Sequence, residues 1–215
     1  MLTVHAAPLV LPVGTSPVAG GAVAVDGGRI AAIGPYERVR DAHPTARVRQ
    51  WPGVLTPGLR QWDCVALLTR LYHPDPREAD ELGEQPLTGA EFARLAGRMD
   101  EARRAGSVRR GLQRMLSHGT THVAGPFDDH AVRTAVARSG LTAVAGAPGG
   151  LPGSPDLDPL ARGGGLPGSV HAPLTVGGRA DLAVFDVPDE AALVAAGAGT
   201  CVATVLGGRL VHRRR

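Results

Sequence analysis

Five side chains of this sequence are candidate ligands for a transition metal: Asp63, His73, His118, His122 and His130. Imidazole nitrogens and carboxylate oxygens that converge on a divalent metal lower the pKa of a metal-bound water, so that hydroxide forms near neutral pH. Hydroxide can then attack a carbon–nitrogen centre. A site of this kind commonly has about three protein ligands around one ion. The elements that carry the five side chains therefore decide whether this chemistry is possible.

The spacing of these residues favours structural roles for several of them. His118 and His122 are four residues apart, which suits two ligands on one helix face. Their stretch, however, is typical of a helix end that runs into a strand, which turns the imidazoles apart. His130 follows the two aspartates 128–129, one of which is expected to cap a helix, and a surface histidine is the alternative to a ligand. His73 lies in a Pro- and Asp-rich stretch that predicts a solvated loop.

Nucleophilic chemistry has less support. The two cysteines, Cys64 and Cys201, are far apart and show no CxxC spacing. This predicts no disulfide framework and is typical of a reducing cytoplasm. Cys64 beside Asp63 is a candidate reactive thiol or ligand, although a buried apolar cysteine is the commoner case. No Gly-x-Ser-x-Gly motif is present, and the absence of lysine excludes Schiff-base chemistry and a carbamylated-lysine metal bridge.

Composition indicates a soluble globular protein. The 215 residues can form one domain or two small ones, and 43% are hydrophobic, but only 3% are aromatic. The core must therefore consist mainly of Ala, Val and Leu. The net charge is +3, and three arginines at 213–215 match that excess, so no nucleic-acid surface is predicted. We also expect no signal peptide and no membrane-spanning segment.

The first fifty residues predict a small β-sheet. Asp26-Gly-Gly28 between the runs 22–25 and 29–33 is a strong hairpin signal. Further strands are expected at 2–11 and 46–51. The predicted core of this sheet is made of Val23, Val25, Ile30, Ile33, Val48 and Trp51.

Beyond Pro57-Gly58 the pattern changes to helices and strands. Thr88 and Glu91 have capping-box spacing, and apolar residues at helical spacing follow as far as Gly119, with Gly106 as a possible break. Several arginines lie off this apolar stripe and predict a solvated helix face. A strand at 120–124, a helix that ends at Gly140 and a strand at 141–145 make a βαβ unit with a parallel strand pair.

The next segment, 147–170, contains 12 Gly or Pro among 24 residues and has no periodicity, so it is predicted to be a linker. The chain then returns to β-structure. A strand is expected at 180–187, a short helix at 189–196, and a hairpin around Gly207-Gly208.

Four motifs in this order resemble the amidohydrolase superfamily, in particular its imidazolonepropionase-like and deaminase-like members. They are Val25–Gly34, the Pro57-Gly-Leu59 turn with its apolar approach, Gly178–Asp186 and Val205–Val211. The resemblance covers roughly 1–146 and 171–215. In the family, the two ends of the chain combine into one β-sandwich around a (β/α)8 barrel.

The resemblance implies an α+β fold. A composite β-sandwich is expected from 1–56 and 171–215, a partial (β/α) barrel-like segment from 57–146, and the linker from 147–170. A full barrel takes about 250 residues, so only its opening strands are expected.

The family's first metal ligands, a His-x-His pair, follow its Pro-Gly-Leu turn. When that motif is laid on Pro57-Gly-Leu59, Asp63 and Val65 take the two histidine positions, and Gln61 takes an aspartate position. Asp63 can bind a metal, but Val65 cannot. The resemblance therefore does not carry over the family's catalytic residues, except Asp63 as a substitute ligand.

Two functions follow as hypotheses. The first is an amidohydrolase-like protein with a degenerate metal site, without a cofactor, that binds a small molecule or a partner protein. Exposed sheet edges invite pairing, so a homo-oligomer or a complex is expected, without nucleic acid or membrane, in the cytoplasm. The alternative is an active hydrolase of non-peptide carbon–nitrogen bonds, a deaminase or cyclic amidohydrolase. It would use zinc or another divalent metal in a rearranged or shared site.

Overall fold

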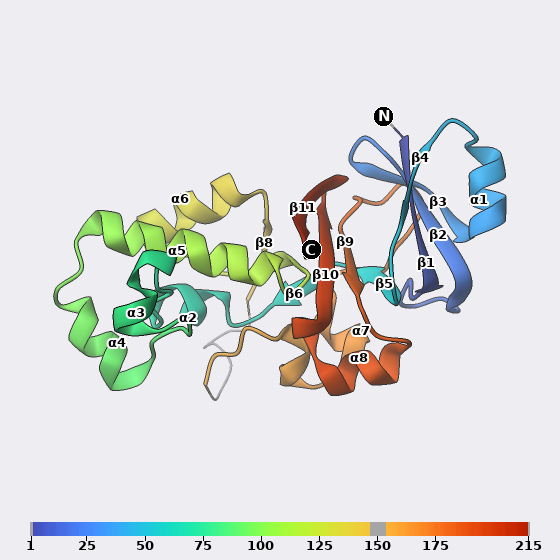
Figure 1. Cartoon of the computed structure of the whole chain (residues 1–215). Helices are drawn as coiled ribbons and strands as arrows, with labels where there is room; N and C mark the ends of the chain where they lie inside the picture. The colour runs from blue at the N-terminus through green and yellow to red at the C-terminus, as the bar shows by residue number, and fades with distance from the viewer. Residues whose placement is uncertain (1, 147–153, 215) are drawn as a thin grey trace. The chain divides into compact units, whose positions relative to one another are not determined.

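A computed structural model describes residues 2–146 and 154–214 (Figure 1). The chain divides into two compact units. Unit 1 takes Met1–Arg60, Leu116–Thr121 and Asp158–Arg215, and unit 2 takes Gln61–Met115 and His122–Leu157. Both ends of the chain therefore belong to the same unit.

Unit 1 is built on a sheet of eight strands in the order β11-β10-β9-β5-β1-β2-β3, with β4 paired to β1 outside this path. The bounds are β1 Leu2–Val10, β2 Val18–Asp26, β3 Arg29–Pro35, β4 Arg47–Gln50, β5 Val54–Pro57, β9 Leu182–Phe185, β10 Cys201–Leu206 and β11 Arg209–Arg213. Strands β5 and β9 pair antiparallel and join the N-terminal strands to the C-terminal ones. The sheet is thus composite, as the sequence predicts.

The two predicted hairpins meet at their turns. Asp26 pairs with Arg29 across the first turn. The N–H of Ala180 donates to the Gly28 carbonyl at 2.8 Å, and the N–H of Gly208 donates to the Ala180 carbonyl at 2.9 Å. A Cβ on Gly208 would overlap the Gly27 carbonyl, so the close approach of the two turns requires glycine.

The main core of unit 1 shows that the sheet folds over on itself. Val23 and Ile30, from β2 and β3, share one buried cluster with Ala203 and Val205 of β10, which lies several strands away in the sheet order. This arrangement gives the predicted sandwich. Val48, predicted in the core, is instead 37% exposed, because it lies in β4, which pairs only with β1.

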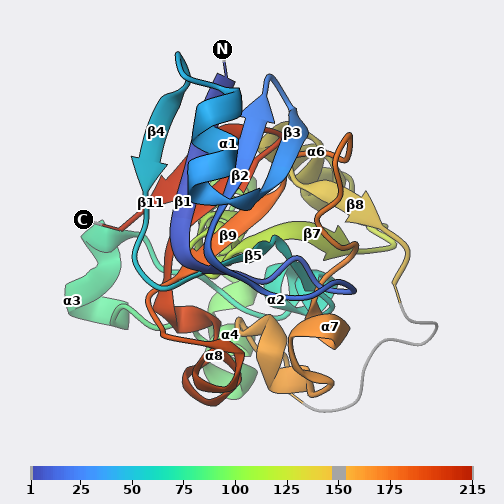
Figure 2. The same ribbon diagram turned by 90° about the vertical axis from the view of Figure 1, so that its right-hand side faces the viewer.

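Short helices cover the outer faces of the sheet. Helix α1 (Tyr36–Ala42) lies over β1 and β2 (Figure 2). Its Val39 packs against alanines of these two strands. On another face lie η2 (Pro159–Arg162), α7 (Gly165–Ser169), α8 (Glu190–Ala196) and η3 (Ala198–Thr200).

The structure differs here from the linker predicted over 147–170. Leu160 and Leu166 are buried in the same cluster as Phe185, and the carboxylate of Asp158 accepts the N–H of Leu160 at 2.8 Å to start η2. Two buried leucines are enough to fix a segment whose Gly and Pro content predicts a loop. The part of this prediction at 147–153 lies outside the described residues.

Unit 2 is mainly helical. Its elements are α2 Cys64–Thr69, η1 Pro76–Glu78, α3 Ala79–Leu82, α4 Gly89–Ala96, α5 Glu101–Leu116, α6 His130–Ser139 and β8 Thr142–Val144. A three-stranded sheet has the order β6-β7-β8, where β6 is Leu59–Gln61 and β7 is Thr120–Ala124, and the unit boundary runs through both of these strands. This sheet stays open within the described residues, so no barrel closes.

The βαβ prediction is confirmed, since β7 and β8 pair in parallel around α6. Asp129 caps α6 by accepting the N–H of Val132 at 3.0 Å, and Gly140 ends it in the left-handed region, with φ 81°. Within the described residues, no helix has the length and apolar character needed to cross a membrane.

The long predicted helix is two helices. The break falls at Gly97, and the carboxylate of Asp100 then accepts the N–H of Arg103 at 2.7 Å and starts α5. Gly106 lies inside α5. Thr88 is the residue before α4, but its side chain makes no cap hydrogen bond.

Candidate functional site

Asp63, at a histidine position of the family motif, and Gln61, at its aspartate position, both bind backbone groups. The Gln61 amide donates to the carbonyls of Asp156 and Leu157, each at 3.0 Å. The Asp63 carboxylate accepts the N–H of Asp156 at 3.2 Å, and the Asp63 N–H donates to the Gln61 side chain at 2.9 Å. Asp63 is 6% exposed. Both side chains therefore fix the segment that returns to the sheet.

A catalytic metal does not fit the residues that the structure describes. Val65 has no donor atom, and it lies in the first turn of α2. No group of three or more His, Cys, Asp or Glu side chains that could hold an ion is found within 2–146 and 154–214. A water-activating metal needs such a group, so no step through a metal can be assigned to these residues.

His73 is a core residue, which corrects the predicted solvated loop. The side chain is 0% exposed, and its Nε2 lies 2.9 Å from the Leu67 carbonyl. The backbone N–H of His73 donates to the Ser107 hydroxyl at 2.9 Å. Burial lowers the pKa of His73, which favours the neutral ring. Its Nδ1 is buried without a hydrogen-bond partner. Gly111 provides the space for this ring, since a Cβ there would come within 2.8 Å of Nε2.

A polar network around a buried tyrosine organises the same region, and sequence reasoning missed it. The Tyr72 hydroxyl donates to Glu78 at 2.6 Å and accepts from Arg103 at 3.0 Å. Arg103 and Arg110 both lie over the Tyr72 ring, at 5.2 and 5.9 Å from its centroid. Arg110 also pairs with Asp75 at 3.0 Å. These arginines are thus structural, although the sequence placed them on a solvated helix face.

One feature of the sequence could have predicted part of this network, namely a second capping-box motif. Asp75 and Glu78 have the required spacing, and both capping hydrogen bonds are present in η1. The sequence prediction used the Thr88–Glu91 match instead.

The other three candidate ligands lie on separate elements. His118 follows α5, with its Nδ1 3.4 Å from the Ser117 hydroxyl. His122 lies in β7, opposite Thr142 of β8. His130 is exposed at the first position of α6. Their assignment as metal ligands therefore remains a prediction.

Neither cysteine has the surroundings of a reactive thiol. Cys64 and Cys201 are both 0% exposed, and burial raises the pKa of each thiol. A reactive cysteine needs a lowered pKa and access. Both cysteines serve as small apolar core residues.

The carboxyl ends of β7 and β8 are tightly closed. The Gly125 N–H donates to the Val144 carbonyl at 2.9 Å, and a Cβ on Gly146 would overlap the Gly125 carbonyl. Barrel enzymes place their sites at such strand ends. Here the two backbones fill that position.

Unit 1 carries a broad groove on the surface of its sheet. The groove has a volume of about 510 Å³ and is lined by Ala6, Ala7, Pro8, Gly20, Gly21, Pro35, Tyr36, Glu37, Gln50 and Trp51. The register places Ala7, Gly21 and Pro35 side by side on neighbouring strands, so three small residues line the groove next to the start of α1. This volume lies within the usual range for small-molecule sites, about 300–1,000 Å³.

Trp51, at the edge of this groove, is fixed by a buried histidine. Its indole N–H donates to Nδ1 of His5 at 3.0 Å, and the guanidinium of Arg213 lies 5.7 Å from the ring centroid. Burial, together with the charge of Arg49, lowers the pKa of His5 to about 4. His5 is therefore neutral at pH 7 and accepts the indole hydrogen bond.

A family model and solved structures show what the chain is similar to. The model of the imidazolonepropionase-like composite domain of bacteria matches residues 21–46, which cover most of β2, all of β3 and α1. This stretch of the chain is therefore similar to an imidazolonepropionase-like domain. The match confirms the resemblance predicted from the hairpin at 25–34. No curated protein sequence matches the chain.

Three similar structures are enzymes of larger size. A. niger ochratoxinase is 18% identical with a TM-score of 0.44, over 67% of this chain and 30% of its own. Helicobacter pylori aminofutalosine deaminase is 16% identical with a TM-score of 0.43, over 67% and 33%. A zinc-bound adenosine deaminase from Xanthomonas campestris is 20% identical with a TM-score of 0.44, over 66% and 33%. The chain thus spans about a third of the length of these proteins.

Proposed function

We propose that this amidohydrolase-like chain does not hydrolyse a substrate but binds a small molecule. One observation carries the proposal. The Asp63 carboxylate, at the position of one of the family's first ligands, and the Gln61 amide, at the aspartate position before it, hold the backbone of 156–157. These side chains provide a structural link where a hydrolase needs ligands that converge on an ion.

The groove of unit 1 is the proposed binding site. Its floor is made of Ala, Gly and Pro, and Tyr36 and Trp51 add aromatic surface. Glu37 supplies an acceptor and Gln50 supplies an amide, both exposed at the groove. Pockets with an apolar lining and a few polar groups favour small, mainly apolar ligands. The class we propose is a neutral, mainly apolar molecule with one hydrogen-bond donor for Glu37.

Fluorescence tests this proposal directly, because the chain contains only 2 tryptophans. Trp62→Phe leaves Trp51 as the sole indole, at the edge of the groove. The probe is N-phenyl-1-naphthylamine, which is neutral, apolar and carries an N–H donor. We expect saturable energy transfer from Trp51 to the probe, with Kd in the micromolar range.

Two further variants in the Trp62→Phe background complete this test. Tyr36→Ala removes one wall of the groove and is expected to weaken binding about tenfold, which equals about 1.4 kcal/mol. Val176→Ala is the control, because Val176 is apolar, 64% exposed and outside the groove. Absence of saturation, or equal affinities in the two variants, would overturn the proposed binding site.

A hydrolase assay tests the proposal that the chain does not hydrolyse a substrate. The protein is incubated with zinc and with amide, cyclic amide and amidine substrates, and ammonia or ring opening is measured. We expect no turnover above that of a variant in which Asp63, His73, His118, His122 and His130 are all replaced by alanine. Turnover that is lost when one of these five side chains is replaced, in a variant that remains folded, would establish the hydrolase instead.

A further inference from the structure

Helix α4 of unit 2 has an apolar side that the rest of the unit leaves incompletely covered. None of its eight residues is buried, although Phe92 and Leu95 lie at helical spacing. Leu95 is only partly buried, as are Leu82 of α3 and Leu87 before α4. Apolar side chains brought together in this way and left partly exposed commonly mark an interaction site.

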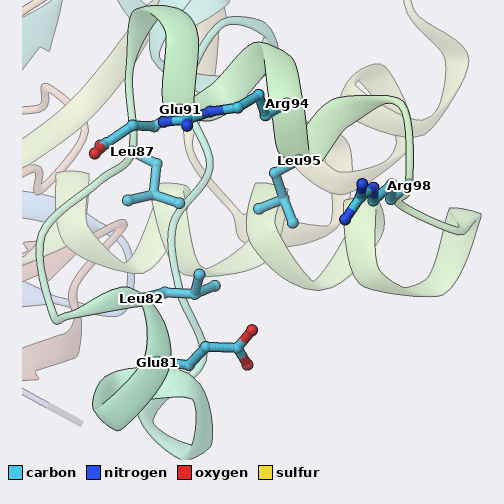
Figure 3. Close-up of a pocket in the computed structure, with 7 residues that line it drawn as sticks. All are labelled: Glu81, Leu82, Leu87, Glu91, Arg94, Leu95 and Arg98. Atoms are coloured by element: carbon cyan, nitrogen blue, oxygen red, sulfur yellow. The ribbon is translucent and has the colours of Figure 1, made fainter.

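These leucines line a groove between α3 and α4 (Figure 3). We call it the leucine groove, and it is lined by Glu81, Leu82, Leu87, Glu91, Arg94, Leu95 and Arg98. Its volume of about 280 Å³ falls below the usual range for small-molecule sites, about 300–1,000 Å³. A volume of this size suits one or two protein side chains better than a whole metabolite.

The charged residues of the groove make no ion pair in the part of the chain that the structure describes. They are Glu81, Glu91, Arg94 and Arg98. The arginines of α5 differ, since Arg103, Arg104 and Arg110 pair with Glu78, Asp129 and Asp75 at 2.7, 2.7 and 3.0 Å.

The two rims of the groove differ in net charge: the α3 side carries Glu81, and the α4 side carries Arg94 and Arg98 together with Glu91. Figure 3 shows Glu81 on the side of α3, and Arg94 and Arg98 on the side of α4 and the turn that follows it. The leucines lie between the rims. In a two-fold dimer each surface patch meets its own copy, so that residue i contacts j and j contacts i. A patch with an acidic rim, an apolar centre and a rim of net positive charge is complementary to itself.

We propose that the leucine groove is the contact surface for a second copy of this chain. The leucines of the two copies pack against each other, and Arg98 of each copy faces Glu81 of the other. The contact is small and its ion pairs are exposed, so each pair contributes little. We expect weak association, with Kd of about 10–100 µM. This inference does not depend on the proposed small-molecule site, which lies in unit 1.

Charge reversal gives the sharpest test, because it uses exposed residues whose replacement leaves the core intact. Sedimentation velocity of the full chain over a range of concentrations measures association. Glu81→Arg alone places like charges opposite each other and is expected to raise Kd at least about tenfold, and so is Arg98→Glu alone. An equimolar mixture of these two variants is expected to associate as well as the wild type, because each Arg then faces a Glu.

A matched pair of substitutions on α4 tests the role of the apolar centre of the leucine groove. Leu95→Asp is expected to abolish the dimer, whereas Ala93→Asp, an exposed position of the same helix outside the groove, leaves Kd unchanged. Circular dichroism confirms that both variants are folded. A wild-type monomer at several hundred micromolar would overturn the proposal. Equal association of the Leu95 and Ala93 variants, or failure of the mixed charge variants to associate, would also do so.

Discussion

The two units of this molecule are stabilised by different means. Unit 1 has separate apolar clusters that combine strands from both chain ends, with Leu55 and Leu182 in one and Phe185 in another, each 0% exposed. Unit 2 also buries apolar side chains, among them Leu67, Met115 and Val123. It adds a polar network of Tyr72, Glu78 and Arg103, and its helix α4 has no buried residue. The two units differ most at α4, whose Phe92 and Leu95 are only partly buried, whereas every residue of β5 and β9 is buried.

The largest expected effect is a core truncation in unit 1. Phe185→Ala removes a ring that is fully buried and packed against Gly119. We expect a loss of about 3–5 kcal/mol in the free energy of unfolding, measured in urea. Leu95→Ala in unit 2 is expected to cost less than about 1 kcal/mol, because Leu95 is partly exposed. Similar losses for the two variants would remove the contrast between the units.

Acid is expected to destabilise unit 1 through His5. Its pKa falls from 6.5 to about 4 on folding, so below pH 6.5 the unfolded chain binds the proton more readily than the folded one. The stabilisation by neutral His5 is complete above pH 6.5 and is lost as the pH falls to about 4, for a total of about 3 kcal/mol.

The matched variant for this prediction is His5→Gln, which keeps an acceptor for the Trp51 indole. Unfolding free energies of both proteins are measured at intervals from pH 7 to pH 4. The difference between the wild type and the variant is expected to shrink in acid. A constant difference across this range would mean that His5 does not carry the effect.

A smaller effect is expected at the contact between the two hairpin turns. Gly208 has φ 78° and its Cα faces the Gly27 carbonyl, so Gly208→Ala is expected to cost about 2 kcal/mol. Gly199→Ala is the control, since a Cβ there meets nothing within 4 Å. Thermal unfolding compares the two variants, and an equal change in Tm would contradict this account of the turn contact.

The smallest effect is expected in unit 2. Tyr72→Phe removes the hydroxyl that joins Glu78 to Arg103 and is expected to cost about 1 kcal/mol. Hydrogen exchange localises the change, with faster exchange expected in η1 and α5 and none in the β1 and β10 strands. Faster exchange in unit 1 would show that the network also supports the composite sheet.

Local signals in the sequence predicted much of the fold. The Asp26-Gly-Gly28 turn fixed the first hairpin, because this turn type matches strand twist. The strand at 120–124 and the helix that ends at Gly140 also agree with β7 and α6. Each depends on contacts between residues close in the sequence, or on a glycine in the left-handed region.

The errors concern residues whose environment comes from distant parts of the chain. His73 has polar neighbours in sequence, yet α2 and α5 bury it through Leu67 and Ser107. Leu160 and Leu166 stand in a Gly- and Pro-rich segment, and Phe185 of a distant strand gives them their core contacts. Composition describes only the local chain, so it cannot predict such contacts.

The candidate site was likewise predicted from the sequence only in part: the residue identities were predicted, and their distant contacts were not. The alignment on Pro57-Gly-Leu59 gave the identity of the substituted positions, including Gln61 and Asp63. It did not show that both would bind the backbone of 156–157, because that segment is about ninety residues away in the sequence.

Zinc binding tests the central claim most directly, namely that Asp63 and Gln61 act as structural links and not as part of a metal site. The full chain is loaded with zinc and dialysed, and its metal content is compared with that of Asp63→Asn. We predict far less than one zinc per chain in both proteins, with lower stability of the Asn variant. One tightly held zinc per wild-type chain, lost in Asp63→Asn, would contradict the account.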